Sequence, residues 1–452
     1  MTSVALISLG CAKNLVDSEI MLGALAKAGY VRVEEPAEAD VLIVNTCSFI
    51  GDAKRESIAA IQEAAAARKG TRQKLIVAGC LAQRYRGQLP ALMPEVDAFL
   101  GLDQVAKVAE IVDEVCARKR RKGESPEEFV SDRPAFIPDY ATPRTRLTPR
   151  HSAYVKIAEG CNHACAFCII PKIRGAHRSR DEGDIVAEVE ALVKGGCREI
   201  NLVSQDATYY GMDKWEGERA RRTSGVDSSR GASLATLLRR LDAIPGDFWI
   251  RVLYTHPAHW SAELVETFAK CRKVVKYVDV PLQHYAAPML EAMRRETGPE
   301  KLDGLVKNLR EGIPDVMIRS TFIVGFPGER DEDFRELSAF VERAGIERGG
   351  VFEYSREEDT RAYNLPGQVH HMTKRRRKNL LSEQLFHLAE KRSESLVGRR
   401  IRVLVEAPGV ARTEWDAPEV DGSVEVPLTL PVGEFAEVQI EDAAGYQLFA
   451  KA

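Results

Sequence analysis

Runs of apolar residues alternate with amphipathic segments over the first 116 residues of the chain. The apolar runs have the length of buried strands, and the segments between them have the 3.6-residue period of helices. This alternation predicts a doubly wound parallel sheet with helices on both faces, in a domain that spans residues 2–116. The expected strands are residues 4–9, 41–44 and 75–78, and the expected helices are residues 18–28 and 53–68.

The periodicity ends near Cys116. Residues 118–122 are all basic, and five prolines follow between residues 126 and 149. Proline and charge in this density favour irregular structure, so we predict a linker over residues 117–146. The basic run is interpreted as a solvated segment, with contact to an acidic partner as the alternative.

A second α/β series occupies residues 147–385, where we predict six strands with helices between them. Six β–α units are too few to close an eight-stranded barrel, so we expect a partial (β/α)6 barrel whose chemistry lies at the carboxyl ends of the strands. The polar residues 213–233 interrupt the series and are predicted to be a surface insertion without a catalytic role. The expected strands are residues 153–157, 200–204, 250–254, 277–280, 318–324 and 351–354.

The end of the chain has a different pattern. A helical connector over residues 374–397 leads to short alternating runs at 401–405, 422–426 and 436–440, separated by Gly and Pro. These runs predict a small all-β barrel, in a terminal domain that spans residues 387–452. From Gly398 onward the chain has five basic and ten acidic residues, a net charge of −5.

Composition narrows the class of protein. The 452 residues are 44% hydrophobic and 29% charged, which is typical of a globular protein of several domains. Residues 1–10 contain no basic leader, and no apolar run has the length of about 20 residues that a membrane span needs, so we expect a cytoplasmic protein without a membrane partner. Nine cysteines in such a protein indicate metal binding or catalysis rather than disulfides.

Six of these cysteines form two sets of three. Cys161, Cys165 and Cys168 have C-x3-C-x2-C spacing just after the first strand of the second series. Three ligands are one short of a closed four-ligand site, which leaves the metal open to a small molecule. A zinc knuckle with His163 as the fourth ligand, or simply buried cysteines, are the alternatives.

The other set lies in the first domain. Cys11, Cys47 and Cys80 each follow one of its three expected strands. Parallel strands end at one edge of the sheet, where such folds place their ligands, so we expect these thiols to meet there. The alternative for any one of them is a buried core thiol.

The C-x3-C-x2-C spacing with Phe167 before the last cysteine resembles the signature of the radical S-adenosylmethionine (SAM) superfamily. The resemblance implies a [4Fe–4S] cluster whose open iron binds SAM, with Phe167 beside the adenine. Residues 320–329, STFIVGFPGE, resemble the glycine-containing strand next to that adenine. There Gly325 and Gly328 would let backbone approach the cofactor, with an ordinary turn as the alternative.

Nearly the whole chain is similar to the methylthiotransferase family of radical SAM enzymes. The similarity is carried by LGCAKN, NTCSFI, GCLAQRY and EGCNHACAFCIIPKIRG, and by the terminal β-barrel, which that family calls a TRAM domain. It implies that Cys11, Cys47 and Cys80 hold a second, auxiliary [4Fe–4S] cluster with an open iron. Cys116, Cys197 and Cys271 match no motif and are interpreted as packing residues.

Within the family the chain resembles the RimO branch, whose substrate is an aspartate of small-subunit ribosomal protein S12. Residues 9–19, LGCAKNLVDSE, carry this resemblance, together with PLQH at 281–284; transfer-RNA members more often have Gln and Met where this chain has Ala12 and Lys13. The acidic terminal barrel also favours a basic protein, free or in the ribosome, over RNA, because phosphate contacts dominate RNA binding.

Two alternatives stay open. The chain could modify adenosine in transfer RNA, with a basic surface at residues 374–378, or it could be a non-catalytic iron–sulfur carrier. The resemblance implies a reaction in which an electron donor such as flavodoxin or ferredoxin reduces the first cluster, SAM gives a 5′-deoxyadenosyl radical, and the substrate carbon takes a methylthio group from the second cluster. No catalytic side chain beyond the cluster ligands is expected.

Overall fold

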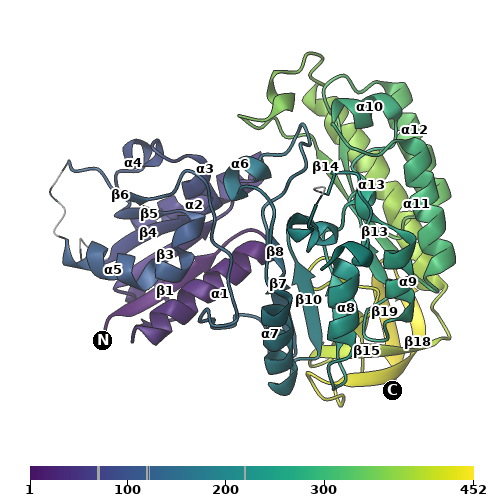
Figure 1. The fold of residues 1–452 in the computed structure, drawn as a ribbon, viewed down its shortest axis with the longest axis horizontal. Coiled ribbons are helices and arrows are strands. Elements are labelled where there is room, and N and C mark those ends of the chain that lie inside the picture. Colours follow the sequence, from purple (N-terminus) through teal and green to yellow (C-terminus); the bar gives the residue numbers. More distant parts are fainter. Residues whose placement is uncertain (69–71, 119–120, 122, 218–219, 452) are drawn as a thin grey trace. The chain divides into compact units, whose positions relative to one another are not determined.

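A computed structural model describes residues 1–68, 72–118, 121, 123–217 and 220–451 (Figure 1). Part of the predicted basic run (Lys119, Arg120 and Lys122), part of the polar stretch (218–219) and residue 452 lie outside the described residues. The chain forms two compact units. The first consists of Met1–Thr148, Glu159–Asn162 and Cys168–Arg180, and the second of Pro149–Ala158, His163–Phe167 and Asp181–Ala452.

The first unit is built on a six-stranded sheet in which every paired strand is parallel, in the order β2-β1-β3-β4-β5-β6. The three predicted strands are confirmed as β1, β3 and β4. The strands are β1 (Ser3–Ser8), β2 (Val31–Arg32), β3 (Val41–Thr46), β4 (Lys74–Gly79), β5 (Ala98–Leu100) and β6 (Glu127–Phe129).

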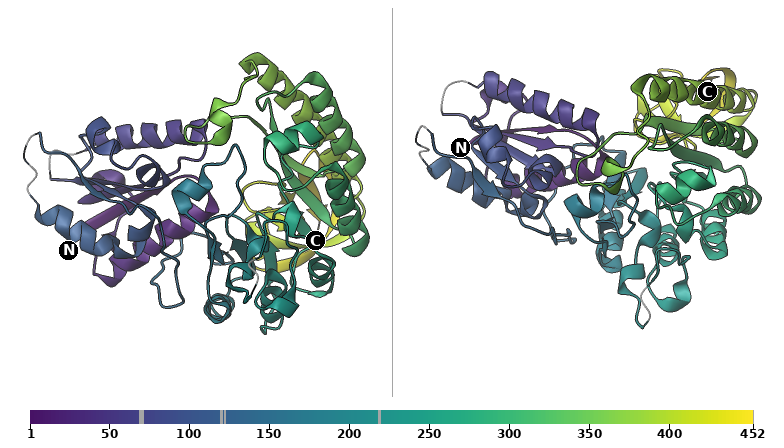
Figure 2. Two further views of the ribbon diagram at one scale, coloured as in Figure 1. Left: turned by 45° about the horizontal axis from the view of Figure 1, so that its top comes forward. Right: turned by 90° about the horizontal axis from the view of Figure 1, so that it is seen from above.

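The central strands β3, β4 and β5 of this sheet are buried on both faces. All six residues of β3 are buried, and its alternate residues Leu42 and Val44 pack in one core cluster with Ile61 of α2. Near-continuous burial is what helices on both faces of a parallel sheet produce, and Figures 1 and 2 show α1 and α2 on opposite faces. The helices are α1 (Ala12–Lys27), α2 (Gly51–Ala66), α3 (Cys80–Arg84), α4 (Leu89–Leu92) and α5 (Val108–Ala117).

Two expectations for this unit need correction. Helix α1 begins at Ala12 and not near residue 18, because its first turns bury polar side chains, Asn14 and Asp17, that break the apolar period. The predicted linker contains β6, which pairs with β5 in the sheet. Its sequence, Glu-Glu-Phe, gives no apolar strand pattern, because edge strands commonly carry charged residues.

The second unit contains the six predicted strands as two parallel three-stranded sheets, β11-β10-β7 and β12-β13-β14. Backbone hydrogen bonds from Thr255 to Asp279 and from Val275 to Ile250 connect the two sheets between β11 and β12, which gives an open arc. The partial barrel is therefore confirmed. Its strands are β7 (Ser152–Lys156), β10 (Glu199–Val203), β11 (Trp249–Val252), β12 (Tyr277–Asp279), β13 (Met317–Val324) and β14 (Arg348–Glu353).

Helices follow the strands of this arc and bury apolar faces against it, with the largest core cluster of the chain between them. The polar residues 213–233 are not merely a surface insertion, because Trp215 and Val226 are buried in that core. The helices are α7 (Glu182–Lys194), α8 (Leu234–Asp242), α9 (Ala262–Lys270), α10 (Ala287–Ala292), α11 (Pro299–Gly312), α12 (Asp331–Ala344) and α13 (His371–Glu394).

The terminal strands close into the predicted barrel, in the order β15-β16-β17-β19-β18. The expected boundary between residues 385 and 387 falls inside α13, a continuous helix that leads from the arc to the barrel. Among the described residues, no helix has the length and apolar character needed to cross a membrane. The strands are β15 (Arg400–Ala407), β16 (Val410–Thr413), β17 (Val424–Glu425), β18 (Phe435–Ala444) and β19 (Gln447–Lys451).

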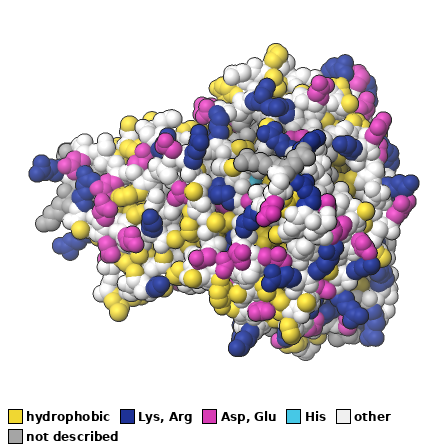
Figure 3. All heavy atoms as spheres, viewed as in Figure 1, with side chains coloured by type: hydrophobic (Ala, Val, Ile, Leu, Met, Phe, Trp, Pro, Cys, Tyr) yellow, Lys and Arg dark blue, Asp and Glu magenta, His cyan; other side chains and the backbone are white. Residues whose placement is uncertain are grey.

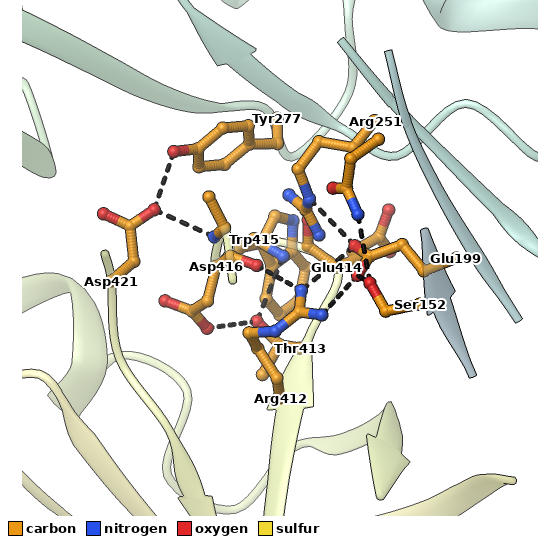
Figure 4. A network of polar contacts seen from close by, with 12 residues as sticks. Ser152, Glu199, Arg251, Tyr277, Arg412, Thr413, Glu414, Trp415, Asp416 and Asp421 are labelled. Atoms are coloured by element: carbon orange, nitrogen blue, oxygen red, sulfur yellow. Dashed lines mark hydrogen bonds and ion pairs between the residues drawn. The ribbon is translucent and has the colours of Figure 1, made fainter. Parts of the chain in front are cut away.

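A buried polar network joins this barrel to the strands of the arc (Figure 4). Glu199 on β10 accepts hydrogen bonds from Arg251 Nε and from Arg412 Nη1 on β16, each at 3.0 Å. Asp416 pairs with Arg348 at 2.8 Å, and Tyr277 donates to Asp421 at 2.6 Å. The barrel is thus held on the arc by buried charges rather than by an apolar contact alone.

Candidate functional site

The structure places the first cysteine set at the carboxyl ends of three neighbouring strands. Cys11 follows β1 and precedes the first residue of α1, Cys47 comes directly after β3, and Cys80 is the first residue of α3 after β4. Strands β1, β3 and β4 are adjacent in the sheet. The three thiols therefore gather at one edge, as the sequence predicted.

Glycines before two of these cysteines make the close approach possible. Gly10 has φ +90° and Gly79 has φ +95°, a region that side chains disfavour. A Cβ on Gly10 would lie 2.6 Å from Cys47 Cβ, and one on Gly79 would lie 2.3 Å from Asn45 Oδ1. A larger residue at either position would push the strand ends apart, so these glycines help to define the spacing of the thiols.

Asparagine side chains tie the same strand ends together. Asn14 Nδ2 donates to the carbonyls of Leu9 at 3.0 Å and Thr46 at 2.8 Å, and Asn45 Nδ2 donates to the carbonyl of Asn14 at 2.9 Å. Both side chains are buried, so these hydrogen bonds are made without competition from water. The loops that carry Cys11 and Cys47 are consequently fixed to each other.

The thiols are close enough to influence one another electrostatically. Burial raises the pKa of Cys80 to about 12, and the neighbouring Cys47 and Cys11 contribute in the same direction. Burial also raises the pKa of Cys47. For Cys11 burial acts the same way, but Lys13 and Arg174 outweigh it and lower the pKa. Three convergent, mostly buried thiols of this kind fit a metal or cluster, which replaces their protons.

A buried arginine compensates the charge that such a site would carry. Arg174, at the end of α6 (Ile170–Arg174), lies in the first unit and is 2% exposed. Its Nη2 donates to Cys80 Sγ at 3.4 Å and to Asn14 Oδ1 at 2.6 Å, and its guanidinium also pairs with Asp17 and Glu159. Positive charge beside thiolates favours their ionised form.

Sequence reasoning did not single out Arg174, Asn14 or Asp17. A signal was present, because all three lie inside the quoted motifs LGCAKNLVDSE and EGCNHACAFCIIPKIRG. Their roles become visible only in the fold, where Arg174 Nη2 meets Asn14 Oδ1 from 160 residues away in the chain. The first set is thus a site of three thiols with a built-in cation.

The second cysteine set lies on residues 160–169, the loop between β8 (Ala158–Glu159) and α6, which we call the signature loop. Cys161 and Cys168 belong to the first unit, where the backbone N–H of Cys161 donates to the carbonyl of Gly175 at 3.1 Å. Cys165 belongs to the second unit, where Arg295 Nη1 lies 3.5 Å from its Sγ. All three thiols are half-buried, so each is accessible to a small molecule and partly shielded from water.

Phe167 and the glycine turn share one hydrophobic cluster of the second unit. Phe167 packs with Phe326 and Tyr354 in that cluster, as does Ile323 of β13. Gly325 has φ +71° and Gly328 has φ +85°, and a Cβ on Gly325 would lie 2.3 Å from Lys374 Cγ. The close packing of Lys374 is therefore a second reason for glycine at position 325, in addition to the approach of a cofactor that the sequence predicted.

A buried carboxylate fixes the conformation of this turn. Glu329 Oε2 accepts hydrogen bonds from the backbone N–H of Gly325 and, at 3.1 Å, from that of Phe326. Its other oxygen pairs with Arg377 at 3.0 Å. Burial raises the pKa of Glu329 to about 7, although Arg377 acts in the opposite direction. The turn is therefore rigid, which suits a surface that receives a planar ring.

Three family models match the chain. Residues 3–101 match the uncharacterized protein family UPF0004, residues 155–341 the radical SAM superfamily, and residues 397–452 the TRAM domain. Solved structures with a similar fold include the radical SAM methyltransferase TsrM from Kitasatospora setae, at 14% identity and a TM-score of 0.55 over 94% of this chain and 80% of that one. TsrM has also been solved with cobalamin and a [4Fe–4S] cluster bound.

Curated relatives match the chain along its full length. The ribosomal protein uS12 methylthiotransferase RimO of Akkermansia muciniphila is 56% identical over 99% of both chains. The protein of the same name from Opitutus terrae is 55% identical over 100% of this chain and 96% of the relative. SAM and [4Fe–4S] clusters are the cofactors of this chemistry. The chain therefore belongs to the methylthiotransferase family of radical SAM enzymes, in its RimO branch.

Proposed function

We propose that this enzyme adds a methylthio group to the β-carbon of an aspartate in small-subunit ribosomal protein S12. The observation that carries the proposal is identity above one half, over nearly the whole of both chains, to proteins named as uS12 methylthiotransferases. The match includes the first domain, with Cys11, Cys47 and Cys80, as well as the radical SAM region. Both cysteine sets therefore enter the proposed reaction.

The chemistry demands a radical because a C–H bond next to a carboxylate is not acidic enough for a side-chain base near neutral pH. When bound, the first cluster would supply the electron, SAM the 5′-deoxyadenosyl radical, and the auxiliary cluster the transferred sulfur. Cys161, Cys165 and Cys168 would hold the cluster that cleaves SAM, and Cys11, Cys47 and Cys80 the auxiliary cluster. Phe167, with the turn at Gly325 and Gly328, would bind the adenine of SAM.

The chain's other residues supply position and charge in this proposal. Arg174 would stabilise the thiolate form of Cys80, to which it donates a hydrogen bond. The hydrophobic cluster around Phe326 and Tyr354 would exclude water from one side of the SAM site. The electron donor would be a flavodoxin or a ferredoxin, for which a chemical reductant can substitute in an assay.

Recognition of S12 rests on a smaller acidic surface than the sequence suggested. Asp416 and Asp421 are bound to the arc, and Glu414 Oε2 accepts from the backbone N–H of Lys276 at 3.0 Å, so these carboxylates are not available to a substrate. On the face drawn in Figure 3, Lys and Arg side chains are interspersed with Asp and Glu side chains. The exposed acidic side chains of the barrel are Glu419, Glu425, Glu434, Glu437, Glu441 and Asp442.

Mass analysis of S12 and of bulk transfer RNA, from cells with and without the gene, tests the proposal. We expect the mass of one methylthio group on an S12 aspartate to disappear when the gene is removed, and to return when the gene is restored. Loss of a methylthio-adenosine from transfer RNA, with S12 unchanged, would instead assign the chain to the transfer-RNA branch.

A further inference from the structure

A cluster of buried imidazoles and a carboxylate, which includes none of the six cysteines, lies in the second unit. His163 comes from the signature loop, Asp206 caps η3 (Ala207–Tyr209) after β10, and His259 ends η6 (Pro257–His259) after β11. The three side chains are 4%, 2% and 0% exposed. Burial to this degree makes their mutual orientation a matter of internal bonding rather than of solvent.

Three polar atoms of this cluster form a small triangle. His163 Nε2 lies 2.9 Å from Asp206 Oδ2 and 3.0 Å from His259 Nε2, and His259 Nε2 lies 3.3 Å from Asp206 Oδ2. Metal–ligand bonds of about 2.0–2.1 Å place neighbouring ligands roughly 3.0–3.4 Å apart in octahedral or tetrahedral geometry. The triangle has the size of one face of such a coordination sphere.

The hydrogen bonds on the far side of each ring show which nitrogen carries the proton. His259 Nδ1 lies 2.6 Å from the carbonyl oxygen of Ser224, which can only accept, so this nitrogen is the donor. His163 Nδ1 lies 3.2 Å from Glu296 Oε2, again an acceptor. In the neutral rings both Nε2 atoms therefore carry lone pairs, and these lone pairs face each other and the Asp206 carboxylate.

The three atoms are close enough to share one cation, which is either a proton or a metal ion. We propose that His163 Nε2, His259 Nε2 and Asp206 Oδ2 bind a divalent metal ion such as Zn²⁺, at a site separate from the iron–sulfur clusters. Histidine ligands that donate their other N–H to a carbonyl or a carboxylate are the usual arrangement around such ions. The competing account is a single proton on His163 shared within the triangle.

A third imidazole, His256, belongs to the surroundings of this ion and not to its ligands. It lies within reach of the other two rings, but its Nδ1 accepts a hydrogen bond from the N–H of Ala258 at 3.2 Å. Its proton is therefore on Nε2, which cannot bind a metal while protonated. The ring stacks on His163 with centroids 3.7 Å apart and so holds the His163 ring in place.

The metal ion would connect the signature loop to the segments that follow β10 and β11. His163 lies between Cys161 and Cys165, whereas Asp206 and His259 follow the two strands. Part of the polar stretch 213–233 takes part, because its Ser224 carbonyl orients His259. This gives that stretch a positioning role, which its composition did not suggest.

Elemental analysis of the holoenzyme tests the proposal. Iron-reconstituted wild-type protein is dialysed against a low concentration of Zn²⁺ and then against metal-free buffer, and zinc and iron per chain are measured together. We expect about one zinc per chain in the wild type, and none in Asp206→Asn or His259→Gln, with iron content unchanged. His256→Gln is the matched control and should retain the zinc, because its ring is not a ligand.

Anomalous scattering at the zinc edge, from crystals of the dialysed holoenzyme, gives a second and independent readout. A peak within bonding distance of both Nε2 atoms and of Asp206 Oδ2 is expected. Wild-type protein that holds no more zinc than Asp206→Asn and shows no peak in the triangle would overturn the proposal in favour of the shared proton. Zinc that persists in both ligand variants would overturn it by placing the metal elsewhere.

Discussion

At the scale of single residues, Arg174 decides the electrostatics of the first cysteine set. Its guanidinium donates to Cys80 Sγ and pairs with Asp17 and Glu159 in the interior of the first unit. A cluster gains negative charge when it is reduced, so a nearby positive charge and a donor to its sulfur both favour the reduced state. Arg174 should therefore raise the reduction potential of the auxiliary cluster that we propose Cys11, Cys47 and Cys80 hold.

The substitution Arg174→Gln tests this effect. We expect the midpoint potential of the cluster on Cys11, Cys47 and Cys80 to become more negative, as measured by a redox titration followed by electron paramagnetic resonance. The free energy of unfolding should also fall by about 3–5 kcal/mol, because Asp17 and Glu159 lose their buried partner.

Arg178→Gln is the control for this substitution, since Arg178 Nη1 bonds to the backbone carbonyls of Arg174 and Ala176 instead of to a thiol. An unchanged potential in Arg174→Gln would mean that the arginine serves the fold alone.

The gathering of Cys11, Cys47 and Cys80 at one sheet edge could be predicted from the sequence, whereas the residues that support these thiols could not. A strand followed by cysteine is a local pattern, and the parallel topology brings such patterns to one edge. Arg174 and Cys80 are 94 residues apart, and His163 and His259 are 96 apart, so no local pattern connects them. Only the packing of loops from different strands makes these pairs.

At the scale of elements, Glu199 on β10 connects the partial barrel to the terminal β-barrel. Burial alone would raise the pKa of Glu199, but Arg412 and Arg251 outweigh it and lower the pKa from 4.5 to about 2. The folded protein therefore prefers the ionised carboxylate. This stabilisation is present at pH values above the ordinary pKa and is lost as the pH falls from about 4.5 toward 2.

The substitution Glu199→Gln should lower the unfolding free energy by about 3–5 kcal/mol near pH 7, because it leaves two guanidinium groups buried without their carboxylate. Thermal unfolding measures the loss as a lower Tm. The Tm difference from the wild type should stay constant above pH 5 and shrink below about pH 4.5. Glu437→Gln, an exposed change on β18, should leave Tm unaffected. A difference between Glu199→Gln and the wild type that grows toward acid pH would contradict the role given to the Glu199 charge.

The terminal barrel should also attract the basic substrate through its exposed face. Changing Glu419, Glu425, Glu437 and Asp442 together to Lys is expected to weaken binding of S12 and to remove most of its salt dependence, because screened attraction supplies part of the affinity. Titration of labelled S12 at several salt concentrations measures both effects. The control is to change Glu332, Glu336, Glu342 and Glu383, on α12 and α13, to Lys. This alters the net charge by the same amount and should weaken S12 binding less. Equal weakening by the two sets would show that only net charge matters.

Element type was more predictable than element bounds. Runs of apolar residues predicted β1, β3, β4 and the six strands of the arc, because buried strand positions are filled mostly by apolar side chains. The three-residue strands β5 and β6 were not predicted, although the equally short β12 was. Helix α13 crosses an expected domain boundary, since a helix that packs on two modules has no break in its period.

At the scale of the whole molecule, the chain combines two three-cysteine sets in one polypeptide. Anaerobically reconstituted protein should hold about eight irons, two [4Fe–4S] clusters. Changing Cys161, Cys165 and Cys168 together to Ala should remove half of that iron and all reductive cleavage of SAM. Iron analysis and chromatography of 5′-deoxyadenosine measure the two losses. Changing Cys116, Cys197 and Cys271 together is the control, and a triple signature variant that kept both clusters would refute the ligand assignment.

One experiment separates sulfur transfer from radical formation. Holoenzyme in which Cys11, Cys47 and Cys80 are changed to Ala is incubated with SAM, a chemical reductant and S12, and both 5′-deoxyadenosine and the mass of S12 are followed. We expect 5′-deoxyadenosine still to form, because the signature cysteines are intact, and S12 to gain no methylthio group. Methylthiolated S12 from this variant would rule out the role proposed for Cys11, Cys47 and Cys80.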